Sequence, residues 1–156
     1  MASDAVTITV PGVPVAQPRQ RMARIGGFLR NYTPASDPVN AFKAAVRIAW
    51  SEATDQPPLS GPVRLSVAFV LPRTQSRPAK VPKSLWSPCR VVNPCKPDLD
   101  NLIKSVKDAL NKLAWNDDGQ VWYVAASKQY AGTEEQPHAT ITVEPERETI
   151  VSGDEE

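Results

Sequence analysis

The stretch KPDLDNLIKSVKDALNKLAWNDDGQV, residues 96–121, determines how the rest of the chain is interpreted. Asp98 and Asp100 stand two residues apart, and an extended backbone, favoured locally by the adjacent proline, would project both carboxylates to one side. From Asn101 the apolar period changes to i, i+4, i+7, i+8 and i+11, formed by Leu102, Val106, Ala109, Leu110 and Leu113. We therefore expect an amphipathic helix that ends near Trp115, with Asp100 or Asn101 as its N-cap.

Acidic residues flank this predicted helix at both ends. Asp98 and Asp100 precede it, Asp117-Asp118 follow it, and Lys104 lies one turn after Asp100. Converging carboxylates repel one another unless a hard cation neutralises them, and Mg²⁺ prefers oxygen ligands and retains waters that can be activated. Each residue alone has a simpler interpretation, as a helix cap, a solvated lysine or a turn. Their joint occurrence around one helix favours a metal site.

The segments KPDLDNLIKSVKDAL and WNDDGQV together resemble the signature of the RusA-type Holliday junction resolvases, which bacteria and their phages carry. By this resemblance Asp98, Asp100 and Asp118 correspond to catalytic, metal-binding aspartates, and Lys104 corresponds to the active-site lysine. The resemblance implies a homodimer that uses Mg²⁺, with Mn²⁺ as a possible substitute, to nick four-way DNA junctions symmetrically in DNA recombination and repair.

Residues next to these aspartates are also interpreted. Asp117 is expected to support the turn or the metal ligands from behind, together with Gln120. Some relatives place an arginine directly before the first aspartate, but this chain has Pro97 there and Lys96 one step earlier. The sequence therefore offers Lys96, and not an arginine, beside the acid pair.

Basic residues are concentrated upstream of the acid pair. Residues 144–156 carry a net charge of −5, so the rest of the chain carries +6 against a total of +1. Residues 13–34 contain no acid, and they are interpreted either as a flexible surface loop or as a basic arm that contacts phosphates and stacks on bases. A second acid-free run covers residues 56–97 and includes a long proline-rich loop. The predicted DNA-binding residues are Arg19, Arg21, Arg24, Arg30, Lys80, Lys83 and Lys96.

The apolar pattern predicts an α+β fold with a mixed sheet of four or five strands and two main helices. Strands are expected at residues 6–10, 63–71, 120–130 and 139–143, with a short additional strand at 89–92 and a first helix from Asp37-Pro38 to residues 54–55. The last two long strands are expected to form a hairpin around residues 132–137. Both faces of the strand at 120–130 are apolar, which indicates a central strand or one covered by a partner chain.

The length of 156 residues predicts one nuclease domain over residues 1–145, followed by an acidic, disordered tail over 146–156. No stretch approaches the ~20 apolar residues of a membrane span, and no signal segment is evident. We therefore expect a cytoplasmic protein. Cys89 and Cys95 are expected to be free thiols, because with one histidine they are too few for a structural zinc site.

Two other classes of protein remain possible from the sequence. The first is a non-catalytic module that binds branched DNA through its basic residues. The second is a calcium-stabilised domain, since Asp98-Leu99-Asp100-Asn101 faintly resembles half of a calcium loop. The glycine and terminal glutamate of such a loop are missing, which argues against the second class.

Overall fold

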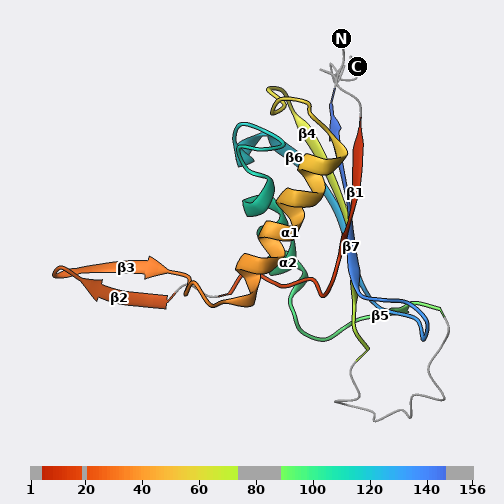
Figure 1. The fold of residues 1–156 in the computed structure, drawn as a ribbon, viewed down its shortest axis with the longest axis horizontal. Coiled ribbons are helices and arrows are strands. Elements are labelled where there is room, and N and C mark those ends of the chain that lie inside the picture. Colours follow the sequence, from red (N-terminus) through yellow and green to blue (C-terminus); the bar gives the residue numbers. More distant parts are fainter. Residues whose placement is uncertain (1–4, 19–20, 74–88, 147–156) are drawn as a thin grey trace, which may run out of the picture.

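The computed structural model describes residues 5–18, 21–73 and 89–146. A five-stranded sheet carries two helices on one face, and a separate two-stranded hairpin projects from this body (Figure 1). In chain order the elements are β1 (Val6–Pro11), β2 (Arg21–Ile25), β3 (Phe28–Tyr32), α1 (Pro38–Ala53), β4 (Val63–Leu71), β5 (Val91–Val92), α2 (Leu99–Leu110), a 3₁₀ turn (Asp118–Gln120), β6 (Val121–Tyr130) and β7 (His138–Pro145).

The strand order in the large sheet is β1-β7-β4-β6-β5. Only β4 and β6 run parallel to each other, while the other neighbouring pairs are antiparallel. The predicted α+β fold, with a mixed sheet and two main helices, is confirmed.

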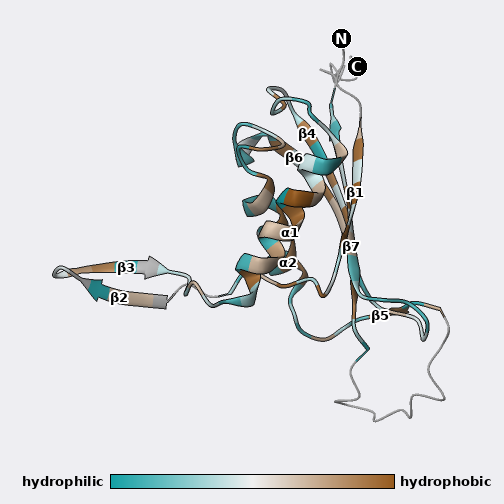
Figure 2. Cartoon of the chain, in the orientation of Figure 1, coloured by the Kyte–Doolittle hydropathy of each residue, from teal (hydrophilic) through white to brown (hydrophobic). Residues whose placement is uncertain are grey.

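The core lies between the helices and one face of the sheet. Along β4 the residues at odd positions from Val63 to Leu71 are buried, as expected for a strand with one face on the core. The helices contribute apolar stripes to the same core (Figure 2): Phe42, Val46 and Trp50 from α1, and Leu102, Val106, Ala109 and Leu110 from α2. Hydrophobic periodicity therefore accounts for which face each element buries.

The start of α1 follows directly from its sequence. The Asp37 carboxylate accepts a hydrogen bond from the Val39 amide at 3.0 Å, and Pro38 occupies the first helical position. The backbone leaves the helix at Thr54. Both ends of this helix are as predicted.

The second helix is shorter at its C-terminal end than the apolar pattern predicted. It ends at Leu110 and not near Trp115, because the backbone leaves helical geometry at Asn111, with ψ of 133°. Lys112 then adopts a positive φ of 68°, which an α-helix cannot contain. Ala114 and Trp115 remain buried all the same. The periodicity continued past the helix because the following coil packs on the same core.

Residues 21–32 form a β-hairpin, which neither interpretation of residues 13–34 had anticipated. Ile25 pairs with Phe28, so Gly26 and Gly27 are the two central turn residues, and both have positive φ (60° and 83°). Such two-residue turns require left-handed backbone at both positions, which glycine adopts readily. The Gly-Gly dipeptide was therefore the signal for this hairpin.

The expected hairpin between β6 and β7 is wrong. Both strands exist with nearly the predicted bounds, but β4 lies between them and pairs with each. The predicted short strand before the acid pair is present as β5, which pairs with Tyr130 and Gln129 at the end of β6.

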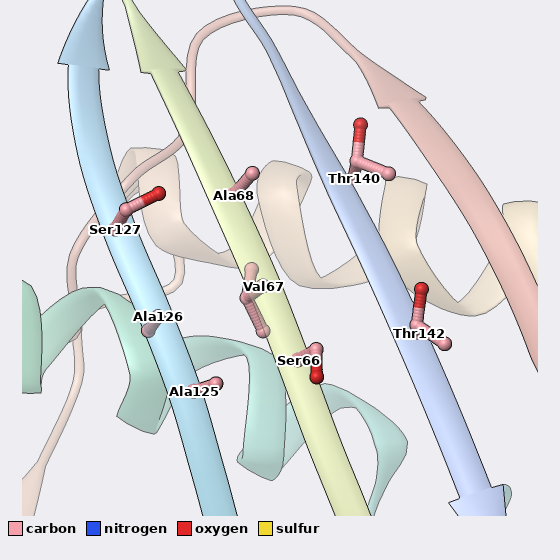
Figure 3. A pocket seen from close by; sticks show the side chains of 8 residues that line it. All are labelled: Ser66, Val67, Ala68, Ala125, Ala126, Ser127, Thr140 and Thr142. Carbon is pink, nitrogen blue, oxygen red and sulfur yellow. The ribbon is translucent and has the colours of Figure 1, made fainter.

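The opposite face of the sheet is not covered by any described element. Figure 3 shows small side chains on this side of β4, β6 and β7, with the helices behind the sheet. They line a shallow hollow and include Ser66, Ala68, Ser127, Thr140 and Thr142. In the described part of the chain, no helix is both long enough and apolar enough to cross a membrane.

Candidate functional site

The first acidic pair lies at the N-terminus of α2. Asp98 is the N-cap residue and Asp100 lies in the first helical turn, so the pair does not share an extended strand as the sequence suggested. Asp98 makes no side-chain capping bond, and both residues are exposed. Two carboxylates are thus available to a ligand at the helix end where the backbone amides favour negative charge.

Two lysines accompany the pair. Lys96 places its Nζ 3.8 Å from Asp98 Oδ2, although both side chains are largely exposed. Lys104 is exposed on α2 one turn after Asp100. The structure therefore brings Asp98, Asp100, Lys96 and Lys104 to the same end of the helix.

The segment leading to Asp98 is held by β6. Lys128 donates hydrogen bonds from Nζ to the carbonyl oxygens of Cys95 and of Pro97, the latter at 2.8 Å. Asn93 is buried and accepts a hydrogen bond from the Cys95 amide at 2.8 Å. A hydrogen bond between Cys95 and Tyr130 raises the pKa of the Tyr130 hydroxyl above its usual value, and burial raises it further. The sequence analysis did not assign a role to Lys128. Its one signal there is that Lys128 is the single charged residue of an otherwise uncharged strand.

The second acidic pair lies in the turn before β6. The Asp117 carboxylate accepts from the Gly119 amide at 2.9 Å, and Asp118 Oδ1 accepts from the indole N–H of Trp115 at 2.9 Å. Trp115 is fully buried, so this bond fixes Asp118 to the core. Asp118 retains its second oxygen for another partner.

Gln120 locks this turn in place through four hydrogen bonds. Its Oε1 accepts from the amides of Asn116 and Asp117, both at 2.8 Å. Its Nε2 donates to the carbonyls of Leu59 and Gly61, at 2.7 and 2.9 Å. The turn that carries Asp118 is thereby tied to the connection between α1 and β4.

The two acidic pairs lie at opposite ends of α2. Asp98 precedes this 12-residue helix, which is about 18 Å long, whereas Asp118 follows its C-terminal end. The strand β6 then runs back, so that Lys128 near its end reaches the backbone before Asp98. Among the described residues of one chain, no group of three acidic, histidine or cysteine residues is close enough to hold a metal ion.

The predicted DNA-binding residues fall in several places. Arg24 and Arg30 are exposed on the β2–β3 hairpin, which also begins with Arg21. Lys96 lies beside Asp98, as described above. Arg19, Lys80 and Lys83 lie outside the described residues, as does the acidic segment from residue 147 onward.

Comparisons with known proteins identify the family of the chain. Residues 11–144 match the family described as "Endodeoxyribonuclease RusA", which covers most of the chain. The chain is also similar to the "Uncharacterized protein YqaN" of Bacillus subtilis (strain 168), with 34% identity over 146 residues, 90% of this chain and 96% of that protein. The chain therefore belongs to the RusA family of endodeoxyribonucleases, enzymes that hydrolyse DNA phosphodiester bonds and resolve Holliday junctions.

Proposed function

We propose that this protein is a Mg²⁺-dependent resolvase that nicks four-way DNA junctions in symmetric pairs, with Asp98, Asp100 and Asp118 as metal ligands. The observation that carries the proposal is the pair of exposed carboxylates at the N-terminus of α2, in a chain of a nuclease family. The donor set suits the ion, because Mg²⁺ binds through one or two carboxylates and keeps several waters. RusA resolvases as a family depend on divalent metals and bind branched DNA.

Asp118 can join this pair only from a second subunit. Within one chain the length of α2 separates it from Asp98 by ~20 Å, far beyond metal–ligand distances of about 2 Å. A homodimer that places Asp118 of one subunit beside the acid pair of the other would complete the site. It would also provide two sites related by symmetry, as paired nicks require.

The strand β6 has the features of a subunit interface. In the described part of the chain, residues 121–127 of β6 pair with β4 on one side and with no strand on the other. Trp122, Tyr123 and Val124 are 56%, 39% and 40% exposed. An uncharged stretch of strand with a free edge, such as residues 121–127, is a template for pairing with another chain.

Antiparallel pairing of two β6 strands would bring the required groups together. A two-fold axis between Val124 and Ala125 would set Val121 of one subunit opposite Lys128 of the partner subunit, because residue numbers across such a pair have a constant sum. Asp118 lies just before Val121, and Lys128 holds the backbone that leads to Asp98. Asp118 of each subunit would thus face Asp98 and Asp100 of the partner subunit.

Each residue has a defined task in this arrangement. When bound, Mg²⁺ supplies an activated water and polarises a phosphoryl oxygen. Lys104 points its ammonium at the reacting phosphate and stabilises developing negative charge. Asp117 and Gln120 orient the turn that carries Asp118. The basic residues of the hairpin and of the proline-rich segment hold the phosphates of the DNA arms.

Cleavage of a four-way junction by purified protein, with and without Mg²⁺, tests the activity. We expect Asp98→Asn and Asp118→Asn to abolish nicking while junction binding persists or tightens, because an uncompensated carboxylate repels the DNA backbone. A protein that binds the junction but leaves it intact at every Mg²⁺ concentration would instead be a non-catalytic branched-DNA-binding module.

Mixed dimers of the two variants test the shared site. When Asp98→Asn and Asp118→Asn chains are co-expressed, a shared site gives dimers in which both substitutions fall in one site and the other is intact. We expect such mixtures to regain single nicks but not paired ones. Mixtures as inactive as each variant alone would show that the three aspartates do not come from two subunits.

A further inference from the structure

The β2–β3 hairpin projects from the body of the protein (Figure 1), and large apolar side chains at its tip are exposed. Phe28 and Leu29, directly after the Gly26-Gly27 turn, are 72% and 62% exposed. Met22 and Tyr32 add further exposed apolar surface on the same ribbon. A two-stranded hairpin has no core of its own and is only marginally stable in water, so these side chains indicate a partner.

The charge of the hairpin identifies the chemistry of that partner. Residues 13–34 contain four arginines and no acidic residue. Arg24 lies opposite Leu29 and Arg30 opposite Ala23, so neither faces an acid across the ribbon. In the described part of the chain, neither arginine forms an ion pair. A ribbon with an apolar tip and unneutralised arginines is complementary to a polyanion that exposes flat apolar surfaces, as DNA does where its bases are unstacked.

We propose that Phe28 and Leu29 insert between bases at the branch point of a DNA junction, while Arg24 and Arg30 bind the flanking phosphates. This inference rests on the proposed function, and it assigns recognition of the branch to the tip of the hairpin and not to the acid pair. Insertion of an apolar wedge into continuous duplex costs a few kcal/mol per unstacked step. At a branch point stacking is already interrupted, so the cost is smaller and the tip discriminates branched from linear DNA.

Binding measured without divalent metal separates this inference from catalysis. We would label a four-way junction with 2-aminopurine either at the branch point or within an arm, and compare it with a linear duplex of the same arm sequence. Wild-type protein is expected to raise the fluorescence of the branch-point label only. The Phe28→Ala/Leu29→Ala variant should lose this signal and bind the junction ~10- to 100-fold more weakly, with duplex binding unchanged.

Three further variants sharpen the test. Phe28→Trp keeps an aromatic wedge and should retain the signal. Arg24→Ala/Arg30→Ala should weaken binding to junction and duplex alike and reduce the salt dependence of both. Ile48→Ala removes an exposed apolar side chain from α1 and should change neither measurement.

Two results would overturn the inference. One is unchanged junction affinity, or an unchanged branch-point signal, in the tip variant. The other is a shift of the tip variant from dimer to monomer in the absence of DNA, which would show that the tip packs against a second subunit. Failure of wild-type protein to cut in Mg²⁺, with the branch-point signal intact, would contradict the proposed function and leave the recognition role of the hairpin standing.

Discussion

At the scale of single residues, Gln120 contributes more to the geometry of the site than its position beside the aspartates suggests. Its side chain forms hydrogen bonds with two amides and two carbonyls of the surrounding coil. We expect Gln120→Ala to lower the free energy of unfolding by ~1–3 kcal/mol, which corresponds to about 2–4 °C in melting temperature per kcal/mol. Thermal denaturation measures this loss.

The isosteric variant Gln120→Glu distinguishes the hydrogen bonds that Gln120 accepts from those that it donates. It keeps the acceptor for the Asn116 and Asp117 amides but sets a carboxylate oxygen against the carbonyls of Leu59 and Gly61. It should therefore be destabilised as well. Gln136→Ala, at an exposed position in the turn before β7, is the control. A melting temperature in Gln120→Ala equal to that of the control would contradict this role.

Lys128 is the second residue whose role depends on three-dimensional structure. Lys128→Met keeps the aliphatic chain but removes the ammonium that binds the carbonyls of Cys95 and Pro97. Because hydrogen bonds to charged groups are stronger than neutral ones, we expect a loss of ~2 kcal/mol in the free energy of unfolding by urea. Amide hydrogen exchange should quicken at residues 93–98. Lys107→Met on α2 is the control, and equal exchange in both variants would refute the role of Lys128 as an anchor.

At the scale of elements, an ion pair connects the β6–β7 turn to the residue before β5. Arg90 and Glu135 approach to 2.8 Å. The hydrogen bond from Arg90 lowers the pKa of Glu135, assisted by the Gly132 amide and by His138, while burial opposes the shift. A depressed carboxyl pKa in the folded state gives stability that is present above the unfolded value of about 4.3 and is lost as the pH falls through the folded value.

The expected test compares melting temperatures of wild type and Glu135→Gln between pH 3 and pH 8. Because the pair is partly exposed, the difference at neutral pH should correspond to less than about 1 kcal/mol, and it should vanish in acid. Glu134→Gln, the neighbouring exposed acid, should show no such difference. A difference in melting temperature that increases as the pH falls would contradict the lowered pKa of Glu135.

Hydrophobic periodicity predicted most helices and strands correctly, but not which strands pair with one another in the sheet. The strands of the large sheet and the start of α1 follow from alternation and capping, which are local properties. The insertion of β4 between β6 and β7 is a non-local choice that no turn signal encodes. The end of α2 was misplaced because Trp115 is buried by coil that packs on the core as a helix would.

In the candidate site, too, the sequence predicted local features but not contacts between distant parts of the chain. The sequence singled out Asp98, Asp100 and Asp118 and the lysine between them, since their spacing around a helix is local. It predicted that the three carboxylates converge, but the length of α2 keeps the third one apart within a chain. Gln120 was expected to support the site in general terms, yet its partners Leu59 and Gly61 lie some sixty residues earlier in the chain.

At the scale of the whole molecule, a substitution that disrupts the proposed dimer should also abolish junction cleavage. Val124 lies beside the proposed two-fold axis and is 40% exposed, so Val124→Lys should leave the fold of the subunit intact. Across the axis the two lysines would lie on adjacent strands, where like charges repel and the solvated side chains resist burial. We expect a monomer in sedimentation velocity, with a melting temperature that no longer depends on protein concentration.

The same variant should lose junction cleavage, because Asp118 no longer reaches the acid pair of another subunit. The matched control is Ile48→Lys, which places the same charge at a 58% exposed apolar position on α1. That control should remain a dimer and cut normally. A monomeric Val124→Lys protein that still nicks four-way DNA would show that one chain builds the site unaided. A dimer that persists in this variant would place the interface elsewhere than the free edge of β6.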